Sequence, residues 1–143
     1  MLELFVVIGL IGVIMAISAP FLLSYVRTSA VRAGAEEMAA VLNRARQLAI
    51  KDNKSMCVTN AGSRVQYHRL ACPPGGIVWT GEGTDSQGFM QLTNNIQVTS
   101  QQVVFTYIGT APTSNATYII TNPQGGTPLK VLVAPSGRIS ITP

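Results

Sequence analysis

The chain has 143 residues, of which 47% are hydrophobic and 11% are charged, and its formal net charge is +4. Soluble domains carry about 25% charged residues, so this composition argues against an ordinary, fully soluble domain and favours one anchored domain. A low charge also suits a surface that is buried against other copies of the chain. The basic excess is modest: it is compatible with an anionic bilayer surface or DNA, but a solvated helix face explains it more simply.

The first 26 residues form an apolar segment in which Glu3 is the only charged residue. The run from Leu4 to Leu23 is long enough to cross a bilayer, because twenty helical residues rise about 30 Å. A signal peptide fits poorly, since its apolar stretch spans about 7–15 residues after a basic region, and no basic residue precedes Arg27 here. A plain transmembrane anchor leaves Glu3 unexplained, because a carboxylate near the bilayer centre costs roughly 2.5 kcal/mol or more. We therefore expect this carboxylate to have a partner.

Residues 27–53 continue the same helix with a different pattern. The segment is rich in Ala, Glu, Arg, Met, Leu and Gln, which favour helix, and it contains no proline. Apolar residues recur along one face at alternating steps of four and three; they are Val31, Ala35, Met38, Leu42, Ala45 and Ala49. The pattern predicts one helix of about 50 residues, far longer than an average globular helix, with an apolar half followed by an amphipathic half.

Residues 54–143 predict a β-rich head. Seven short runs are rich in Val, Ile, Thr and Tyr and are separated by turn residues; they are Ser55–Thr59, Arg64–Leu70, Ile96–Thr99, Val103–Ile108, Thr117–Thr121, Leu129–Ala134 and Arg138–Thr142. We expect a hairpin with a four-residue connection at 60–63 and another hairpin that turns at 135–137. The stretch Pro73–Asn95 is predicted to be a long ordered loop with at most one short strand. The fold class is therefore α+β, with a long helix packed on an antiparallel sheet.

The head contains two cysteines, Cys57 and Cys72. If they are bonded, they close a loop of about 16 residues and contribute roughly 3 kcal/mol. A zinc site is disfavoured because His68 is too distant for ligand spacing, and a redox pair is disfavoured because no C-x-x-C motif is present. The disulfide is the favoured alternative, and it predicts that the head folds outside the cytoplasm.

Few residues of the head suit catalysis. His68 is the only histidine of the chain, and Glu82 and Asp85 are the only acidic residues of the head. Two carboxylates without a third ligand are more often a solvated loop than an acid–base pair or a Ca²⁺ contact. The sequence has no nucleophile elbow, phosphate loop or dinucleotide fingerprint. We therefore expect no enzymatic activity, no metal and no cofactor.

The start of the chain resembles the N-terminus of type IV pilins and pseudopilins. The resemblance rests on Leu-Glu-Leu at 2–4, the Val-, Ile- and Gly-rich run, and Ala-Pro at 19–20, with Glu3 and Pro20 at the family's spacing. It implies a pilin fold and a structural subunit of a type IV pilus or a type II secretion-like filament. Such a subunit resides in the inner membrane before assembly and then enters an extracellular or periplasm-spanning filament. The implied partners are copies of the chain, other pilins, the inner-membrane assembly platform and the prepilin peptidase that precedes N-methylation.

The resemblance also implies roles for residues of the apolar half. Glu3 is expected to meet the N-terminal amine of a neighbouring subunit and to set its register, and Leu4 and Phe5 belong to the same assembly surface. Gly12 and Pro20 bracket residues 13–19. Because proline removes a helical hydrogen bond and glycine lowers helix propensity, we expect this bracketed segment to stretch or melt in a filament.

The head resembles the GspH/FimT subgroup of these proteins. The resemblance rests on Cys57, Cys72, Trp-Thr-Gly at 79–81, and the end of the chain, where Gly-Arg leads the last strand. Some FimT-like proteins use a Gly-Arg-x-Arg sequence to bind DNA during uptake. Here Arg138 is followed by Ile and Ser, so the second arginine is missing, and phosphate-driven affinity increases with the number of cationic contacts. A DNA-binding minor pilin is therefore the alternative to a purely structural subunit.

Overall fold

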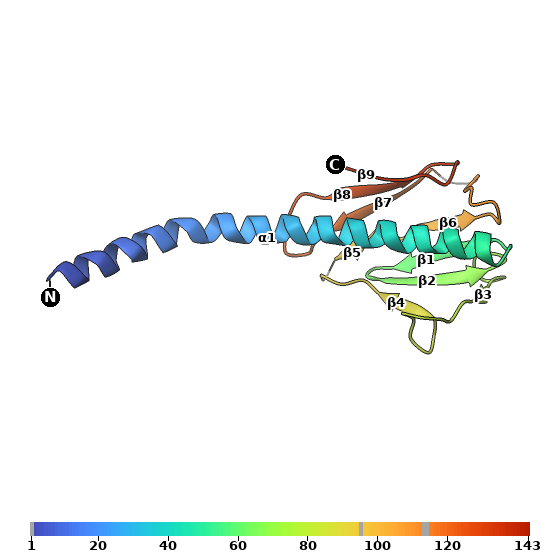
Figure 1. Cartoon of the computed structure of the whole chain (residues 1–143), viewed down its shortest axis with the longest axis horizontal. Helices are drawn as coiled ribbons and strands as arrows, with labels where there is room; N and C mark the ends of the chain where they lie inside the picture. The colour runs from blue at the N-terminus through green and yellow to red at the C-terminus, as the bar shows by residue number, and fades with distance from the viewer. Residues whose placement is uncertain (1, 95, 113–114) are drawn as a thin grey trace.

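The computed structural model describes residues 2–94, 96–112 and 115–143, with the side chains of residues 2, 19 and 20 excepted. One long helix, α1 (Leu2–Lys51), lies beside two antiparallel sheets, and its first half extends away from them (Figure 1). The helix runs for 50 residues, which confirms the sequence prediction. It ends at Lys51 rather than Asn53, because Asn53 has a φ of 49° and the Lys54 N–H donates back to the Ala49 carbonyl at 3.1 Å.

The head consists of two sheets. The first has the order β3-β2-β1-β6, with β4 also paired to β2. Its strands are β1 (Met56–Ala61), β2 (Arg64–Arg69), β3 (Ile77–Val78), β4 (Phe89–Gln91) and β6 (Gln102–Phe105). The second has the order β5-β7-β8-β9, and its strands are β5 (Gln97–Val98), β7 (Ala116–Thr121), β8 (Leu129–Val133) and β9 (Ile139–Thr142). Each of these pairings is antiparallel, so the predicted α+β class is confirmed.

The predicted four-residue connection of the first hairpin is wrong. Ala61 pairs with Arg64, so the connection between β1 and β2 consists of Gly62 and Ser63 alone. Gly62 has a φ of 61°, a left-handed conformation that glycine adopts without steric cost and that tight hairpin turns require. The sequence cue of Asn and Gly indicated a turn correctly but not its length.

Two other boundaries differ from the prediction. The stretch 73–95 contains both β3 and β4 rather than at most one strand, because two segments of it pair with β2. The strand predicted to reach Ile108 ends at Phe105. Beyond it the chain closes a turn in which the Gly109 N–H donates to the Thr106 carbonyl and the Thr106 N–H donates to the Thr110 carbonyl, both at 2.8 Å. Local hydrogen bonding therefore replaces the sheet ladder here.

The core lies between the second half of α1 and the inner faces of both sheets (Figure 1). Every residue of the predicted stripe has an exposed fraction of 0%: Val31, Ala35, Met38, Leu42, Ala45 and Ala49. The sheets contribute large buried side chains that include Tyr67, Phe105 and Tyr118. The Tyr67 hydroxyl also donates to the Val41 carbonyl of α1 at 2.7 Å. This half of the helix is thus an integral part of the head.

Asn60 connects the two sheets. Its buried amide nitrogen donates to the carbonyls of Val98 at 3.2 Å and Thr99 at 3.0 Å. Its Oδ1 accepts the Gln101 N–H at 2.9 Å. Because a buried amide is costly unless it is hydrogen-bonded, this network fixes the chain segment between β5 and β6 against the end of β1.

Candidate assembly surface

The first half of α1 carries apolar side chains that no other described segment covers. Leu4 is 62% exposed and Phe5 is 72% exposed, and the rest of this half is similarly open to solvent. We call the exposed apolar side chains from Leu4 to Val26 the bare apolar surface. Besides Leu4 and Phe5 it contains Val6, Val7, Ile8, Leu10, Ile11, Val13, Ile14, Met15, Ile17, Phe21, Leu22, Leu23, Tyr25 and Val26.

This half of the helix has the physical properties of a membrane span. Its most apolar 18-residue window has a mean hydropathy of 2.6 and is 0% buried. A helix satisfies its own backbone hydrogen bonds, which an apolar environment requires. Ser18 follows the same rule, because its hydroxyl donates to the Ile14 carbonyl at 2.8 Å. The segment therefore suits either a bilayer or a dry bundle of helices.

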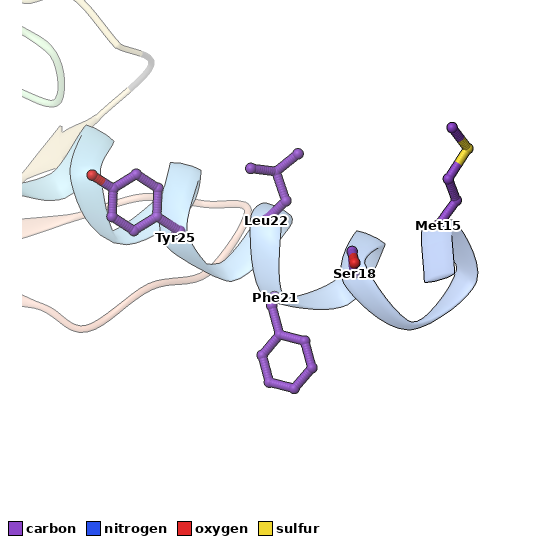
Figure 2. Close-up of a pocket in the computed structure, with 5 residues that line it drawn as sticks. All are labelled: Met15, Ser18, Phe21, Leu22 and Tyr25. Carbon is purple, nitrogen blue, oxygen red and sulfur yellow. The ribbon is translucent and has the colours of Figure 1, made fainter. Parts of the chain in front are cut away.

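A shallow groove lies on the bare apolar surface close to the head. Figure 2 shows the five side chains that line it: Met15, Ser18, Phe21, Leu22 and Tyr25. The structure buries Tyr67 and Tyr118 but leaves Tyr25 and Tyr107 exposed. Tyr25 lies two residues before Arg27, and this pair of residue types is common where a helix leaves the hydrocarbon layer.

The predicted assembly residues share one element. Glu3 lies in the first turn of α1, is exposed, and forms no salt bridge within the described residues. Leu4 and Phe5 continue the same turn. Gly12 has no other side chain or distant backbone within 4 Å of the position of an added Cβ, and Pro20 lies within the unbroken helix. The helix N-terminus favours a carboxylate, but it supplies no full positive charge to pair with Glu3.

The cysteines lie in the head, far along the chain from this surface. Cys57 of β1 and Cys72 form a disulfide, with their Cα atoms 5.2 Å apart. His68 pairs with Cys57 across the two strands, and both of its ring nitrogens are buried without a hydrogen-bond partner. Burial lowers the pKa of His68 because the charged imidazolium loses its hydration. The disulfide closes the stretch of chain from Cys57 to Cys72, which contains β2, and its role is structural.

Arg138 is exposed just before the last strand, β9. The tertiary structure places Arg46 of α1 against the turn that precedes Arg138. The Arg46 Nε lies 3.3 Å from the position that a Cβ on Gly137 would occupy and 3.0 Å from the corresponding position on Gly109. Local sequence patterns carry no signal for this proximity, because the contact joins segments about ninety positions apart.

The acidic loop of the head has a structural role. The Asp85 carboxylate accepts the N–H groups of Gln87 and Phe89, both at 2.8 Å, which closes the loop on itself. Arg44 donates to the Glu82 carbonyl at 2.6 Å, and its guanidinium lies 5.6 Å from the Trp79 ring centroid. Within the described residues, no group of three His, Cys, Asp or Glu side chains is arranged to hold a metal ion.

Comparison with known proteins relates this fold to filament subunits. The chain matches the family model of the type II transport protein GspH over residues 34–139. It resembles the crystal structure of the Pseudomonas aeruginosa type IV minor pilin FimU, with a TM-score of 0.57 and 21% identity, covering 79% of this chain and 88% of that chain. It also resembles the Vibrio cholerae minor pseudopilin EpsH of the type II secretion system, with a TM-score of 0.56 and 13% identity, covering 80% and 94%. No curated protein sequence matches.

The structural likeness at these low identities supports the fold, and the family match supports the relationship. That match begins at Gly34, so it rests on the buried stripe and the head rather than on the bare apolar surface. Pilins and pseudopilins are structural subunits, so the chain is not an enzyme. The chain belongs to the family of the type II transport protein GspH.

Proposed function

We propose that the chain polymerises through its bare apolar surface as a subunit of a helical filament. The observation that supports this is the difference in coverage along α1: the apolar stripe from Val31 to Ala49 is buried by the head, whereas the bare apolar surface is exposed. Each large apolar side chain gains roughly 1.5–3 kcal/mol on burial. Summed over the bare apolar surface, the free energy gained on burial would be large enough to hold a polymer together without covalent links.

Two environments in succession would cover this surface. Before assembly, lipid of the inner membrane surrounds it, with Tyr25 and Arg27 at the headgroup level. After extraction by the assembly platform, the helices of neighbouring subunits replace the lipid, in an extracellular or periplasm-spanning filament. The neighbours are copies of this chain or other pilins. Processing by a prepilin peptidase belongs to the same proposal.

Glu3 sets the register of each incoming subunit in this scheme. Its carboxylate lies in the first turn of α1, forms no salt bridge within residues 2–94, 96–112 and 115–143, and would meet the N-terminal amine of a neighbouring subunit. In a low-dielectric bundle, removal of one partner of such a pair costs about 3–5 kcal/mol, because the other charge stays buried alone. The pair would therefore discriminate strongly against misaligned docking.

The test compares Glu3→Gln with Ser24→Ala, a polar-to-apolar change on the same helix. We expect Glu3→Gln to insert into the membrane normally but to reduce incorporation into sheared filaments by about tenfold or more. Ser24→Ala should insert and assemble normally, because the Ser24 hydroxyl donates to the Phe21 carbonyl of its own helix at 2.9 Å. Immunoblots of membrane and filament fractions measure both quantities. Normal incorporation of Glu3→Gln would refute the register role.

The segment between Gly12 and Pro20 belongs to the same mechanism. It is helical in the single chain, and we propose that it stretches or melts on assembly. Helical hydrogen bonds over residues 13–19 should be intact in the detergent-solubilised subunit and broken in an assembled filament examined by electron cryomicroscopy. An unbroken helix in both states contradicts this part of the proposal.

DNA binding is the second candidate function. The observation that favours it is the position of Arg46 beside the turn that carries Arg138, which gives two arginines where the sequence motif offers one. The test measures binding of fluorescent duplex DNA to the full chain in detergent across a salt series. Arg138→Ala should weaken binding and reduce the salt slope by about 1. Lys130→Ala, on β8, is the matched control, and the absence of salt-sensitive binding by the unmodified chain excludes this function.

A further inference from the structure

The outer face of the first sheet, which lies opposite α1, carries His68 and Cys57 next to each other. The Tyr67 hydroxyl of β2 reaches the Val41 carbonyl of α1, so the alternation of a strand directs His68 to the other face of the sheet. Cys57 and His68 are directly paired across β1 and β2. Directly opposite residues of an antiparallel pair have Cβ atoms about 4.5–5.5 Å apart. The imidazole therefore lies beside the Cys57 side chain.

The chain that follows β2 covers this pair. We call residues 70–76 the clasp loop. Its Cys72 is bonded to Cys57 of β1. A Cβ added to Gly76 would lie 2.8 Å from the His68 Cβ, so the backbone of the loop rests directly on the His68 side chain. His68 is only 4% exposed, and Cys57 is fully buried. The loop and the disulfide thus enclose the imidazole against the sheet.

The groups packed around His68 include only two that can exchange a proton with it. Both ring nitrogens of His68 are buried without a hydrogen-bond partner within the described residues. The titratable residue that β1 places opposite it is Cys57, and the clasp loop contributes Cys72; β3 consists of two apolar residues. Arg69 follows His68 on β2, lies on the opposite face of the strand and pairs with Asp52 at 2.9 Å. The natural partner of the imidazole is therefore a cysteine sulfur that has been released from the disulfide.

We propose that the Cys57–Cys72 disulfide is a redox-responsive clasp, which a dithiol reductant opens with the help of His68. A thiolate of the dithiol attacks Cys72, because this sulfur belongs to a half-buried residue whereas Cys57 is fully buried. The disulfide breaks, a mixed disulfide forms between the dithiol and Cys72, and Cys57 leaves as a thiolate. His68 takes up one proton and pairs with this thiolate. A stabilised thiolate is a better leaving group, so the pair favours opening.

The second thiol of the reductant completes the exchange. It attacks the reductant's own sulfur in the mixed disulfide, becomes oxidised to a disulfide with it, and releases Cys72, which takes up the second proton. Two electrons and two protons thus pass from the dithiol to the chain. Leu70 of the clasp loop has a φ of 75°, a left-handed conformation that leucine rarely adopts. Opening therefore allows the loop to relax away from β1. The clasp belongs to the head and does not depend on the proposed polymerisation.

The first experiment measures the rate at which dithiothreitol reduces the full chain in detergent near pH 7. Alkylation of the released thiols and mass spectrometry follow the reaction, and circular dichroism checks that each variant is folded. We expect His68→Gln to slow opening by about tenfold, because the leaving thiolate loses its cationic partner. Gln66→Ala is the matched control on the same face of β2; it removes only the bond from the Gln66 Nε2 to the Gln87 carbonyl at 2.8 Å and should keep the original rate. A folded His68→Gln variant that opens as fast as the unmodified chain, or faster, overturns the proposal.

The second experiment leaves His68 in place and uses Cys72→Ser, in which Cys57 is the only thiol. The ultraviolet absorbance of the thiolate measures the fraction of Cys57 that is ionised near neutral pH, in the folded chain and in denaturant. Burial alone would lower this fraction on folding, whereas a pair with His68 raises it. We expect the fraction to be about tenfold higher in the folded chain. A fraction that is unchanged or lower on folding refutes the role of His68, even if His68→Gln cannot be prepared in a folded form.

Discussion

The two halves of α1 form one continuous helix but have opposite surroundings. In the second half, the apolar residues follow a single face and the head buries them completely; in the first half, apolar side chains project on all sides and remain exposed. A one-sided stripe can be satisfied by one neighbouring layer, whereas an all-round apolar helix must be surrounded. The difference indicates that the second half packs within the chain and the first half packs against lipid or other chains.

Side-chain size differs in the same way. The buried stripe contains Ala35, Ala45 and Ala49, which let the sheets approach the helix closely. At Gly34 an added Cβ would collide with the Ile96 side chain, so even alanine would be too large there without movement. The bare apolar surface is instead built from Leu, Ile, Val and Phe, with Met15 and Tyr25. The small residues of the buried stripe therefore allow one particular neighbour within the fold to approach closely.

The strongest test of this comparison truncates one leucine in each half. Leu42→Ala should destabilise the head by about 2–5 kcal/mol, because it leaves a cavity in a buried site. Leu22→Ala should leave the unfolding of the isolated subunit unchanged and reduce filament incorporation instead. Circular dichroism of the full chain in detergent, with filament yield measured in cells, checks both. Equal destabilisation by the two changes would show that the halves are not distinct.

Removal of the disulfide affects one region only. Replacement of Cys57 and Cys72 by serine should lower the stability of the head by roughly 3 kcal/mol, with membrane insertion of the first half unaffected. Thermal unfolding of the full chain in detergent measures the loss. A reducing agent should give a similar loss in the unmodified chain and none in the double variant, and a loss in the double variant on reduction would contradict this assignment.

Asn60→Ala tests the connection between the two sheets. Since the change leaves buried carbonyl and N–H groups without partners, it should cost about 1–3 kcal/mol. Asn122→Ala is the matched control, because the Asn122 carboxamide oxygen accepts only the Gln124 N–H in an exposed loop, at 2.9 Å. Unfolding midpoints of the two variants compare the losses, and similar midpoints would argue against the connecting role of Asn60.

The smallest expected effect is a pH dependence that belongs to the head. The pKa of His68 is lower in the folded chain than in the unfolded chain, so the unfolded state binds the extra proton first as the pH falls. The stability associated with His68 is therefore complete above the ordinary histidine pKa of about 6.5 and decreases as the pH falls below it. Unfolding midpoints between pH 7 and pH 5 measure the decrease. His68→Gln should remove the part of the pH dependence that is due to this residue. If the variant keeps the same pH profile, another titratable group causes the decrease.

Local patterns predicted the helix, the buried stripe from Val31 to Ala49 and the separation of the head from the apolar half. These features are determined by hydrophobic period and composition, which are properties of neighbouring residues. The strands of the head were predicted less accurately. Both β3 and β4 lie in a stretch expected to be mostly loop, because their pairing with β2 depends on residues distant in the chain rather than on their own composition.

By itself, the sequence determined that the chain has a long helix whose halves need different partners, since hydrophobicity and its periodicity are local. It also supplied the residues of the candidate assembly surface, from Glu3 to Pro20. Only the tertiary structure determined that Tyr25 is exposed and that Arg46 lies beside the turn of Arg138. The physical reason is that exposure and proximity depend on how the helix and the two sheets pack, which no single segment encodes.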